Sequence, residues 1–321
     1  MTFRRASKIF LVVRRRRAHA DLQVQRKWLP SPRFFFHVGK FPRYLYATIE
    51  SARFFNPDAP IFLISDQKDT GVEALGVESR TPESVWHPNL QTFLDRYVHL
   101  SVFKRDYERI CMARWFHLEQ LMRNESLERA AFLDSDAMLF HRVADLFRYF
   151  PESAHLGVSK GGGPAFTFVR HTIAPFLNLM LEKFLDRDFL DARRRLVEAR
   201  LDNLNDMAFL LLFTGLGDGR GVSYSNHLPV GHIDHCIFAN DDGLLSAPNR
   251  RHVSRKRIFW EDKDGTFVPS YRSVEDGRKV PALVVHFQNG ATRRIRRFNR
   301  VGRDSWVPRA LRFRYYSYLL N

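Results

Sequence analysis

Two aspartates separated by one residue, Asp134 and Asp136, are the side chains of this sequence best suited to hold a metal ion. An apolar run at 130–133 comes directly before them, and a second apolar run begins at Ala137. Because the backbone turns where a buried strand ends, both carboxylates can converge on one ligand. Carboxylate oxygens suit Mg²⁺ or Mn²⁺, and such ions leave coordination positions for phosphate oxygens. We therefore predict a Mn²⁺ or Mg²⁺ site here, the alternative being a pair of exposed loop acids.

The first elements of the chain predict the kind of sheet that carries these acids. The apolar run at 34–38 predicts a buried strand closed by Gly39, and a helix is expected from Pro42 to Phe55. A second buried strand is expected at 61–64. A strand, a helix and a strand in this order form a βαβ unit, which implies a parallel sheet with a right-handed crossover. Ligands of such sheets bind beyond the carboxyl ends of the strands.

The rest of the chain continues this α/β pattern. We expect a long helix at 102–122, strands at 130–133 and 165–169, and helices at 172–199 and 204–214. The stretch 220–290 is rich in turns and has one further clear strand at 282–286. The predicted fold class is therefore α/β, with a mainly parallel central sheet flanked by helices.

The net charge of +16 is concentrated at the two ends of the chain. Residues 1–33 have a net charge of +9 and residues 250–321 of +12, whereas residues 34–249 have a net charge of −5. We predict a basic N-terminal arm at 1–32, one domain at 33–298 and a basic, aromatic extension at 299–321. The ends suit an anionic membrane surface, although solubility and a GC-rich genome explain the charge as well. Nucleic acid is not expected as a partner, because the central part is net acidic.

Cysteine content and hydropathy indicate the compartment. Cys111 and Cys236 form neither a disulfide framework nor a zinc site, which is typical of a reducing environment. The apolar run at 9–13 is short for a signal peptide, and no run approaches the ~20 residues of a membrane span. We expect a cytoplasmic protein that can also associate peripherally with the inner face of the membrane.

Several of these motifs together resemble the GT-A glycosyltransferases, which use nucleotide sugars as donors. The resemblance lies in Phe36-His37-Val38-Gly39 with the helix and strand that follow, in 112–116, and in Phe132-Leu133-Asp134-Ser135-Asp136. It covers about residues 33–290 and is most specific at the Asp-x-Asp metal motif. Among GT-A enzymes, the resemblance is to bacterial enzymes that build surface polysaccharide or lipopolysaccharide. These belong to the broad neighbourhood of glycogenin and the galactosyltransferases of lipopolysaccharide.

The resemblance implies a third metal ligand and a diphosphate clamp after the last strand. His286 ends that strand, and the resemblance implies that its neutral imidazole binds the metal. It implies further that Gly290 lets the backbone approach a phosphate and that Arg293 holds the diphosphate. The family usually has lysine at that place, and Arg294 competes with Arg293 for the role. A histidine that only packs in the core is the alternative for His286.

The same resemblance suggests two further side chains that could contact the donor substrate. Arg114 is expected to contact the diphosphate or the donor sugar, or else to form a salt bridge with Glu119 or Glu108 on its helix. Asp66 is expected to touch the nucleotide base or ribose, or only to form a turn.

A glycine loop and Asp206 complete the set of candidates. Gly162 and Gly163 are expected to let the backbone approach the donor sugar, a plain turn being the alternative. Asp206 is the predicted catalytic residue, which orients a hydroxyl group or acts as a base, and its alternative is a helix N-cap. A further group at 232–235, with His232, Asp234 and His235, suits either acceptor binding or loop packing.

The predicted function is metal-dependent transfer of a sugar, most simply from a UDP-sugar, to a hydroxyl of a glycan or glycolipid. A sugar-nucleotide nucleotidyltransferase is a rival, but only Gly39-Lys40 follows the first strand, where those enzymes have a glycine-rich basic loop. An anion- or nucleic-acid-binding protein is a second rival, and an inactive scaffold on the same fold is a third. The sequence leaves open the sugar, the base, the acceptor, the oligomeric state and whether the anomeric configuration is retained.

Overall fold

The computed structural model describes residues 31–238, 243–248, 254–263, 266–288, 291–292 and 295. Its centre is a mixed sheet that, within these residues, has seven strands. All strands run parallel to one another except β7, which is antiparallel to both of its neighbours. The spatial order is β3 (Val77–Arg80), β2 (Ile61–Ser65), β1 (Arg33–His37), β4 (Arg129–Leu133), β7 (Phe166–Arg170), β6 (Leu156–Ser159) and β8 (Gly221–Tyr224). The α/β fold with a mainly parallel, helix-flanked sheet is confirmed.

Alternating side chains of the strands build two apolar layers, one on each face of the sheet. Phe34 and Phe132 pack into one layer, and their neighbours Phe35 and Leu133 pack into the other. The first face is covered by α4 (Leu90–Arg96), α5 (Arg105–Asn124), α7 (Ala174–Lys183), α8 (Arg187–Glu198) and α9 (Asp206–Gly215). The second is covered by α2 (Arg43–Phe55), α3 (Thr70–Glu73) and α6 (Val143–Leu146). Strands buried on both faces explain the unbroken apolar runs of the sequence.

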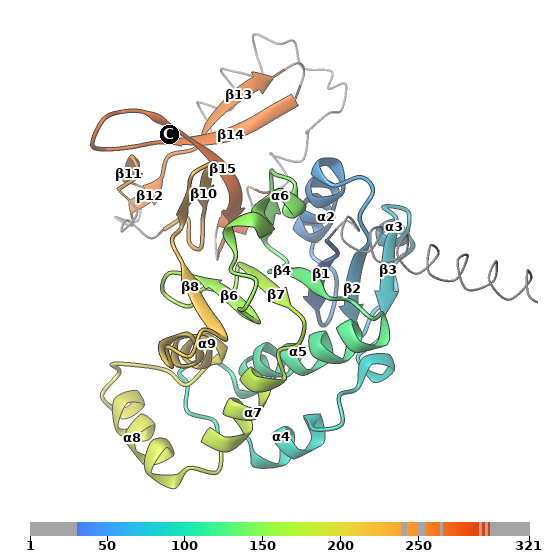
Figure 1. Cartoon of the computed structure of the whole chain (residues 1–321), viewed down its shortest axis with the longest axis vertical. Helices are drawn as coiled ribbons and strands as arrows, with labels where there is room; N and C mark the ends of the chain where they lie inside the picture. The colour runs from blue at the N-terminus through green and yellow to red at the C-terminus, as the bar shows by residue number, and fades with distance from the viewer. Residues whose placement is uncertain are drawn as a thin grey trace, which may run out of the picture.

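A second sheet lies beyond the carboxyl edge of the first, at the top of the view in Figure 1. It pairs β13 (Phe259–Lys263), β14 (Thr266–Arg272), β15 (Lys279–His286), β10 (Gly231–Ile233) and β9 (His227–Leu228) in this order. The short strand β5 (Ala137–Leu139), which directly follows the Asp-x-Asp motif, pairs with β15. A separate pair consists of β11 (Ser246–Pro248) and β12 (Ser254–Lys256). The second sheet therefore connects the end of β4 to the C-terminal part of the domain.

Two expectations about elements are wrong in detail. The stretch 172–199 forms two helices, because Asp186 caps the start of α8 with a hydrogen bond from the backbone N–H of Phe189. The long helix α5 begins at Arg105 rather than at Val102, which is exposed. The remaining irregular segments include two short 3₁₀ turns, Glu83–Val85 and Phe147–Tyr149.

The predicted boundaries of the domain and its two extensions remain predictions, since residues 1–30 and 296–321 lie outside the described residues. No helix among the described residues combines the length and the apolar character that a membrane crossing needs.

Candidate metal centre and active site

The Asp-x-Asp motif forms the turn between β4 and β5. The backbone N–H of Asp134 donates to the carbonyl of Ala165 at the start of β7 (3.2 Å), and the N–H of Ala137 donates back to the carbonyl of Asp134 (2.9 Å). On the opposite side of the turn, the Thr48 hydroxyl of α2 donates to the carbonyl of Ser135 (2.9 Å). The turn is thus held by both neighbouring elements, which fixes the direction of its two carboxylates at the carboxyl edge of the sheet.

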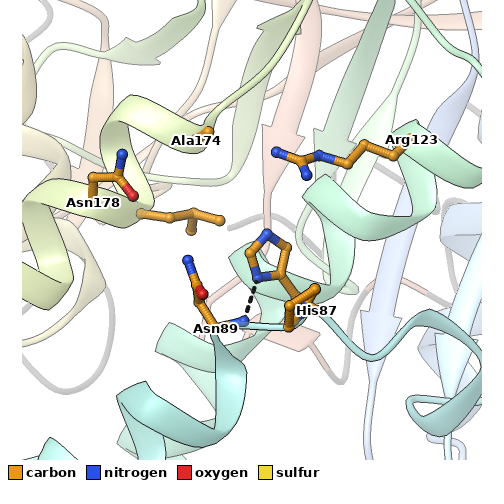
Figure 2. A pocket seen from close by; sticks show the side chains of 7 residues that line it. His87, Asn89, Arg123, Ala174 and Asn178 are labelled. Atoms are coloured by element: carbon orange, nitrogen blue, oxygen red, sulfur yellow. Dashed lines mark hydrogen bonds between the residues drawn. The ribbon is translucent and has the colours of Figure 1, made fainter.

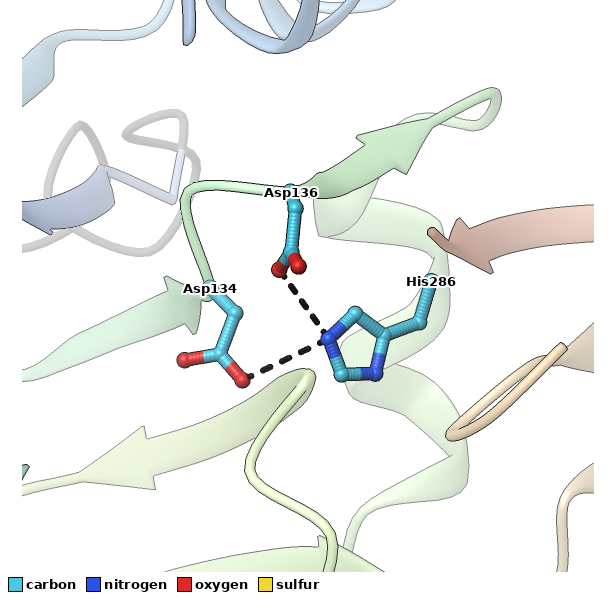
Figure 3. Close-up of side chains that lie close together, drawn as sticks. All are labelled: Asp134, Asp136 and His286. Atoms are coloured by element: carbon cyan, nitrogen blue, oxygen red, sulfur yellow. Dashed lines mark hydrogen bonds and ion pairs between the residues drawn. The ribbon is translucent and has the colours of Figure 1, made fainter. Parts of the chain in front are cut away.

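His286 reaches the same turn through the pairing of β15 with β5. The register places His286 opposite Ala137, so its ring lies beside Asp136. Figure 3 shows its Nε2 atom facing both acids, at 3.0 Å from Oδ1 of Asp136 and 3.8 Å from Oδ2 of Asp134. One ligand atom from each of the three residues lies within 4.8 Å of the other two. The structure therefore brings the three predicted metal ligands together, although His286 and Asp136 are 150 residues apart along the chain.

The hydrogen bonds of His286 favour ligation through Nε2. Its Nδ1 donates to the carbonyl of His235 at 2.6 Å, which leaves Nε2 directed at the acids. Burial opposes the charged imidazolium, but the carboxylates of Asp136 and Asp134 outweigh burial and raise the pKa of His286 to about 9. A strongly negative environment at Nε2 favours a proton or a metal cation at this point. Two carboxylate oxygens and one imidazole nitrogen are a donor set that fits Mn²⁺.

Arg114 connects the metal motif to Asp206. Its guanidinium donates to Oδ1 of Asp134 (2.7 Å) and to Oδ2 of Asp206 (2.5 Å), and it lies over the ring of Phe132. The indole N–H of Trp115 also donates to Oδ2 of Asp206 (3.3 Å). Although burial disfavours its charge, the two carboxylates raise the pKa of Arg114 well above its ordinary value. The helix-surface salt bridges with Glu119 or Glu108 are absent from the described contacts of Arg114.

Asp206 is the first residue of α9 and is 5% exposed. The N-cap of this helix is Asn205, whose side chain accepts from the N–H of Ala208. The capping role considered for Asp206 therefore belongs to its neighbour. Arg114 and Trp115 both donate to the Oδ2 atom of Asp206. No described residue donates a hydrogen bond to its Oδ1 atom.

The glycine loop lies between α9 and the segment that carries His235. Gly162 has φ +74°, and a Cβ added there would lie 2.6 Å from Cγ of Leu211 and 2.9 Å from the carbonyl of Met207. A Cβ added at Gly163 would lie 3.2 Å from Cβ of His235. Close packing of the loop against these two segments explains both glycines. Their predicted role in approaching a sugar remains a prediction.

Asp66 joins two loops at the same edge of the sheet. It follows β2, and its Oδ1 accepts the backbone N–H of Gly39, which follows β1, at 2.7 Å. Gly39 itself has φ +88°. This contact supports the turn-forming interpretation of Asp66 and leaves its contact with a nucleotide a prediction. Gly290 and Arg293, like Arg294, lie outside the described residues.

The group at 232–235 packs next to His286, and among the described residues it does not belong to the cluster that could hold a metal ion. Asp234 is fully buried, and it accepts from Nζ of Lys256 (2.7 Å) and from the hydroxyl of Tyr271 (3.0 Å). Its pKa lies well below its ordinary value: burial opposes ionisation, but the neighbouring His232 and the charge of Lys256 outweigh burial. The cluster fixes the 234–236 segment, and with it the His235 carbonyl that orients His286.

Two tyrosines near the site are not among the residues predicted from the sequence. Tyr44 of α2 forms a hydrogen bond with Ser135, and its burial and the charge of Asp136 raise its pKa. Tyr107 of α5 lies beside Cys111, which together with burial raises the pKa of the Tyr107 hydroxyl, and the charge of Asp134 adds a smaller contribution. Neither follows a strand or belongs to a charged motif. Only the helical spacing of Cys111 and Arg114 from Tyr107 could have suggested a shared face.

Comparison with known proteins gives structural similarity without sequence similarity. No protein-family model matches the sequence, and no curated protein matches it significantly. Mouse xyloside xylosyltransferase 1 is similar over 61% of this chain and 85% of its own, with 11% identity and a TM-score of 0.44. The galactosyltransferase LgtC, solved with donor and acceptor sugar analogs, is similar over 88% of this chain and 99% of its own, with 13% identity and a TM-score of 0.42.

The glycosyltransferase GlyE of Streptococcus pneumoniae is similar over 60% of this chain and 45% of its own, with 12% identity and a TM-score of 0.35. All three are named glycosyltransferases.

Proposed function

We propose that this protein is a metal-dependent glycosyltransferase, which moves a sugar from a nucleoside diphosphate sugar to a hydroxyl of a glycan or glycolipid. The observation that supports it most directly is the convergence of Asp134, Asp136 and His286 at the carboxyl edge of a mainly parallel sheet. Ligands of such sheets bind at this edge. The membrane as a partner, UDP as the nucleotide and surface polysaccharide synthesis as the process belong to the same proposal.

The three ligands would hold Mn²⁺ or Mg²⁺. When bound, the ion supplies Lewis-acid stabilisation of the negative charge on a departing diphosphate. In the transfer itself, the bond between the anomeric carbon and the diphosphate oxygen breaks, and a bond to the acceptor oxygen forms. The proton of the acceptor hydroxyl passes to the departing nucleoside diphosphate. The chain's own residues bind and orient both substrates around this exchange.

Arg114 is the residue best placed to contact the donor beside the metal ligands. A guanidinium presents its donors in a planar fork that matches phosphate geometry. In this structure the fork is held by Asp134 and Asp206, which fixes its position before a substrate arrives. Such preorganisation lowers the cost of ordering on binding.

Asp206 is the carboxylate that we assign to the substrate hydroxyls. Its Oδ2 is engaged by Arg114 and Trp115, so Oδ1 is the atom that would accept a hydrogen bond from a sugar hydroxyl. A carboxylate with one oxygen in a salt bridge suits orientation better than proton abstraction.

Thermal unfolding in the presence of sugar nucleotides tests the proposal. With Mn²⁺, UDP and one UDP-sugar should raise the Tm by several degrees at concentrations well above their Kd, and the shift should vanish in EDTA. Asp136→Asn should abolish it, whereas Asp191→Asn, a change of the same type on the surface of α8, should retain it. The donor assignment is wrong if no nucleoside diphosphate or sugar nucleotide stabilises the protein with any divalent metal. Stabilisation by a nucleoside triphosphate with a sugar phosphate would instead favour the nucleotidyltransferase.

A further inference from the structure

A cavity lies at the carboxyl end of α5, away from the metal centre. Its volume is about 300 Å³, and it is lined by His87, Pro88, Asn89, Arg123, Ala174, Leu177 and Asn178. Arg123 is nine residues beyond Arg114, which corresponds to about 13 Å along a helix. The cavity is therefore separate from the site that the proposed function uses.

The imidazole of His87 lines this cavity and has a donor without a described partner. The residue is 5% exposed, and its Nδ1 accepts the backbone N–H of Asn89 at 3.1 Å. Because Nδ1 is an acceptor, the proton of the neutral ring is on Nε2. This Nε2 atom is buried and has no hydrogen-bond partner among the described residues. Buried donors without a partner are rare and unfavourable, so this one calls for an acceptor.

Arg123 directs a charged donor toward the same space. Only its Nε has a described partner, the carboxylate of Glu119 at 2.8 Å, and its side chain is 53% exposed. Glu119 is itself held by the Thr172 hydroxyl and the backbone N–H of Ile173, which fixes the arginine stem. Figure 2 shows the Arg123 guanidinium and the outer nitrogen of His87 facing the space between α5 and α7.

The other residues that line the cavity also favour a hydrogen-bond acceptor with negative charge. The side-chain amide of Asn178 lines the cavity on the opposite side, where Ala174 marks the amino end of α7. The amino end of a ten-residue helix carries partial positive charge. Burial and the neighbouring Arg123 lower the pKa of His87, so the ring is neutral and donates through Nε2 alone at neutral pH.

We propose that this cavity binds a small oxyanion, a phosphate or carboxylate group that accepts hydrogen bonds from His87 Nε2 and the Arg123 guanidinium. An oxyanion has several oxygens, so one such group can accept from both donors. The cavity volume exceeds that of inorganic phosphate, so the oxyanion can belong to a larger small molecule. This site does not depend on the proposed function.

The test follows the ¹⁵N signals of His87 in the full-length protein during titration with inorganic phosphate or acetate in EDTA. EDTA removes the metal from the other site, and the His87 signals report on this cavity alone. We expect a saturable shift with an apparent Kd in the millimolar range or below. Tighter binding of phosphate identifies a phosphoryl ligand, and tighter binding of acetate identifies a carboxylate.

Three variants make the result specific. Arg123→Gln should weaken binding about tenfold or more, because a charged donor is lost. Arg123→Lys, which keeps the charge, should recover part of the affinity. The control Arg148→Gln removes an arginine of similar exposure that pairs with Asp145 on a different face, and should bind as the parent does. The proposal is overturned if the His87 signals do not move up to about 50 mM of either anion, or if folded Arg123→Gln binds as tightly as the parent.

Discussion

At the scale of single residues, Asp134 couples the two halves of the site. One of its oxygens accepts from Arg114, and the other faces His286. A change in charge at either neighbour therefore acts on the other through the same carboxylate. Asp136 has no such second partner among the described contacts, so it is the cleaner probe of metal binding.

Metal binding should depend on pH through His286. Its pKa in the folded protein is about 9, so at lower pH a metal ion must displace a proton from Nε2. Raising the pH removes this competitor, and the affinity for Mn²⁺ should increase by up to about tenfold per pH unit below that value. Calorimetry in two buffers with different ionisation enthalpies should show about one proton released per ion. Binding without proton release would show that His286 is not a ligand.

Arg114 and Asp206 should be strongly coupled in stability. Arg114→Gln leaves the buried carboxylate of Asp206 without its ionic partner, which should lower the free energy of unfolding by about 3 kcal/mol. Adding Asp206→Asn should recover much of this loss, because the unpaired charge is removed. A double-mutant cycle from urea unfolding measures the coupling. Strictly additive effects would contradict the ion pair.

At the scale of elements, the loop before β7 determines where α9 and Asp206 lie. Gly161 and Gly162 both have positive φ values, but only a Cβ at Gly162 would meet α9. Gly161→Ala should cost about 1 kcal/mol for its backbone conformation alone. Gly162→Ala should cost clearly more, since Leu211 and the carbonyl of Met207 must move. Chemical denaturation of the two variants compares them directly, and equal losses would mean that the loop does not support α9.

Four strands of the first sheet, β1, β2, β4 and β7, were predictable because each is a largely apolar run that ends in a turn, whereas β3, β6 and β8 were not among the expected strands. This pattern alone located Asp134 and Asp66 at one edge of the sheet. The second sheet was not predictable in the same way. β13 and β14 mix aromatic and charged residues, as in Phe259–Lys263, so neither has the unbroken apolar run of a fully buried strand. Their pairing with β15, which delivers His286, is a long-range contact that no local pattern encodes.

Two details at the ends of helices could also not be predicted from the sequence. The N-cap role considered for Asp206 in the sequence belongs to Asn205, and Asp206 instead pairs with Arg114, which is 92 residues away. The break between α7 and α8 depends on Asp186, whose capping hydrogen bond competes with continuation of the helix.

At the scale of the whole molecule, the basic ends and the net acidic centre divide the chain into parts of opposite charge. If the ends associate with an anionic membrane, deletion of residues 1–30 and 300–321 should reduce cosedimentation with vesicles that contain anionic lipid. The interaction should weaken with salt, because charge attraction is screened over about 10 Å at 0.1 M ionic strength. Neutral vesicles are the control. Unchanged sedimentation after the deletion would exclude this role for the ends.

The most direct measurement is the binding of Mn²⁺ to the full-length protein by calorimetry at pH 8. We predict one ion per chain for the parent protein. Asp136→Asn should weaken binding by about 100-fold, and the surface control Asp191→Asn should leave it unchanged. Equal affinity in Asp136→Asn and the parent would contradict the metal centre, and with it the function proposed for the site.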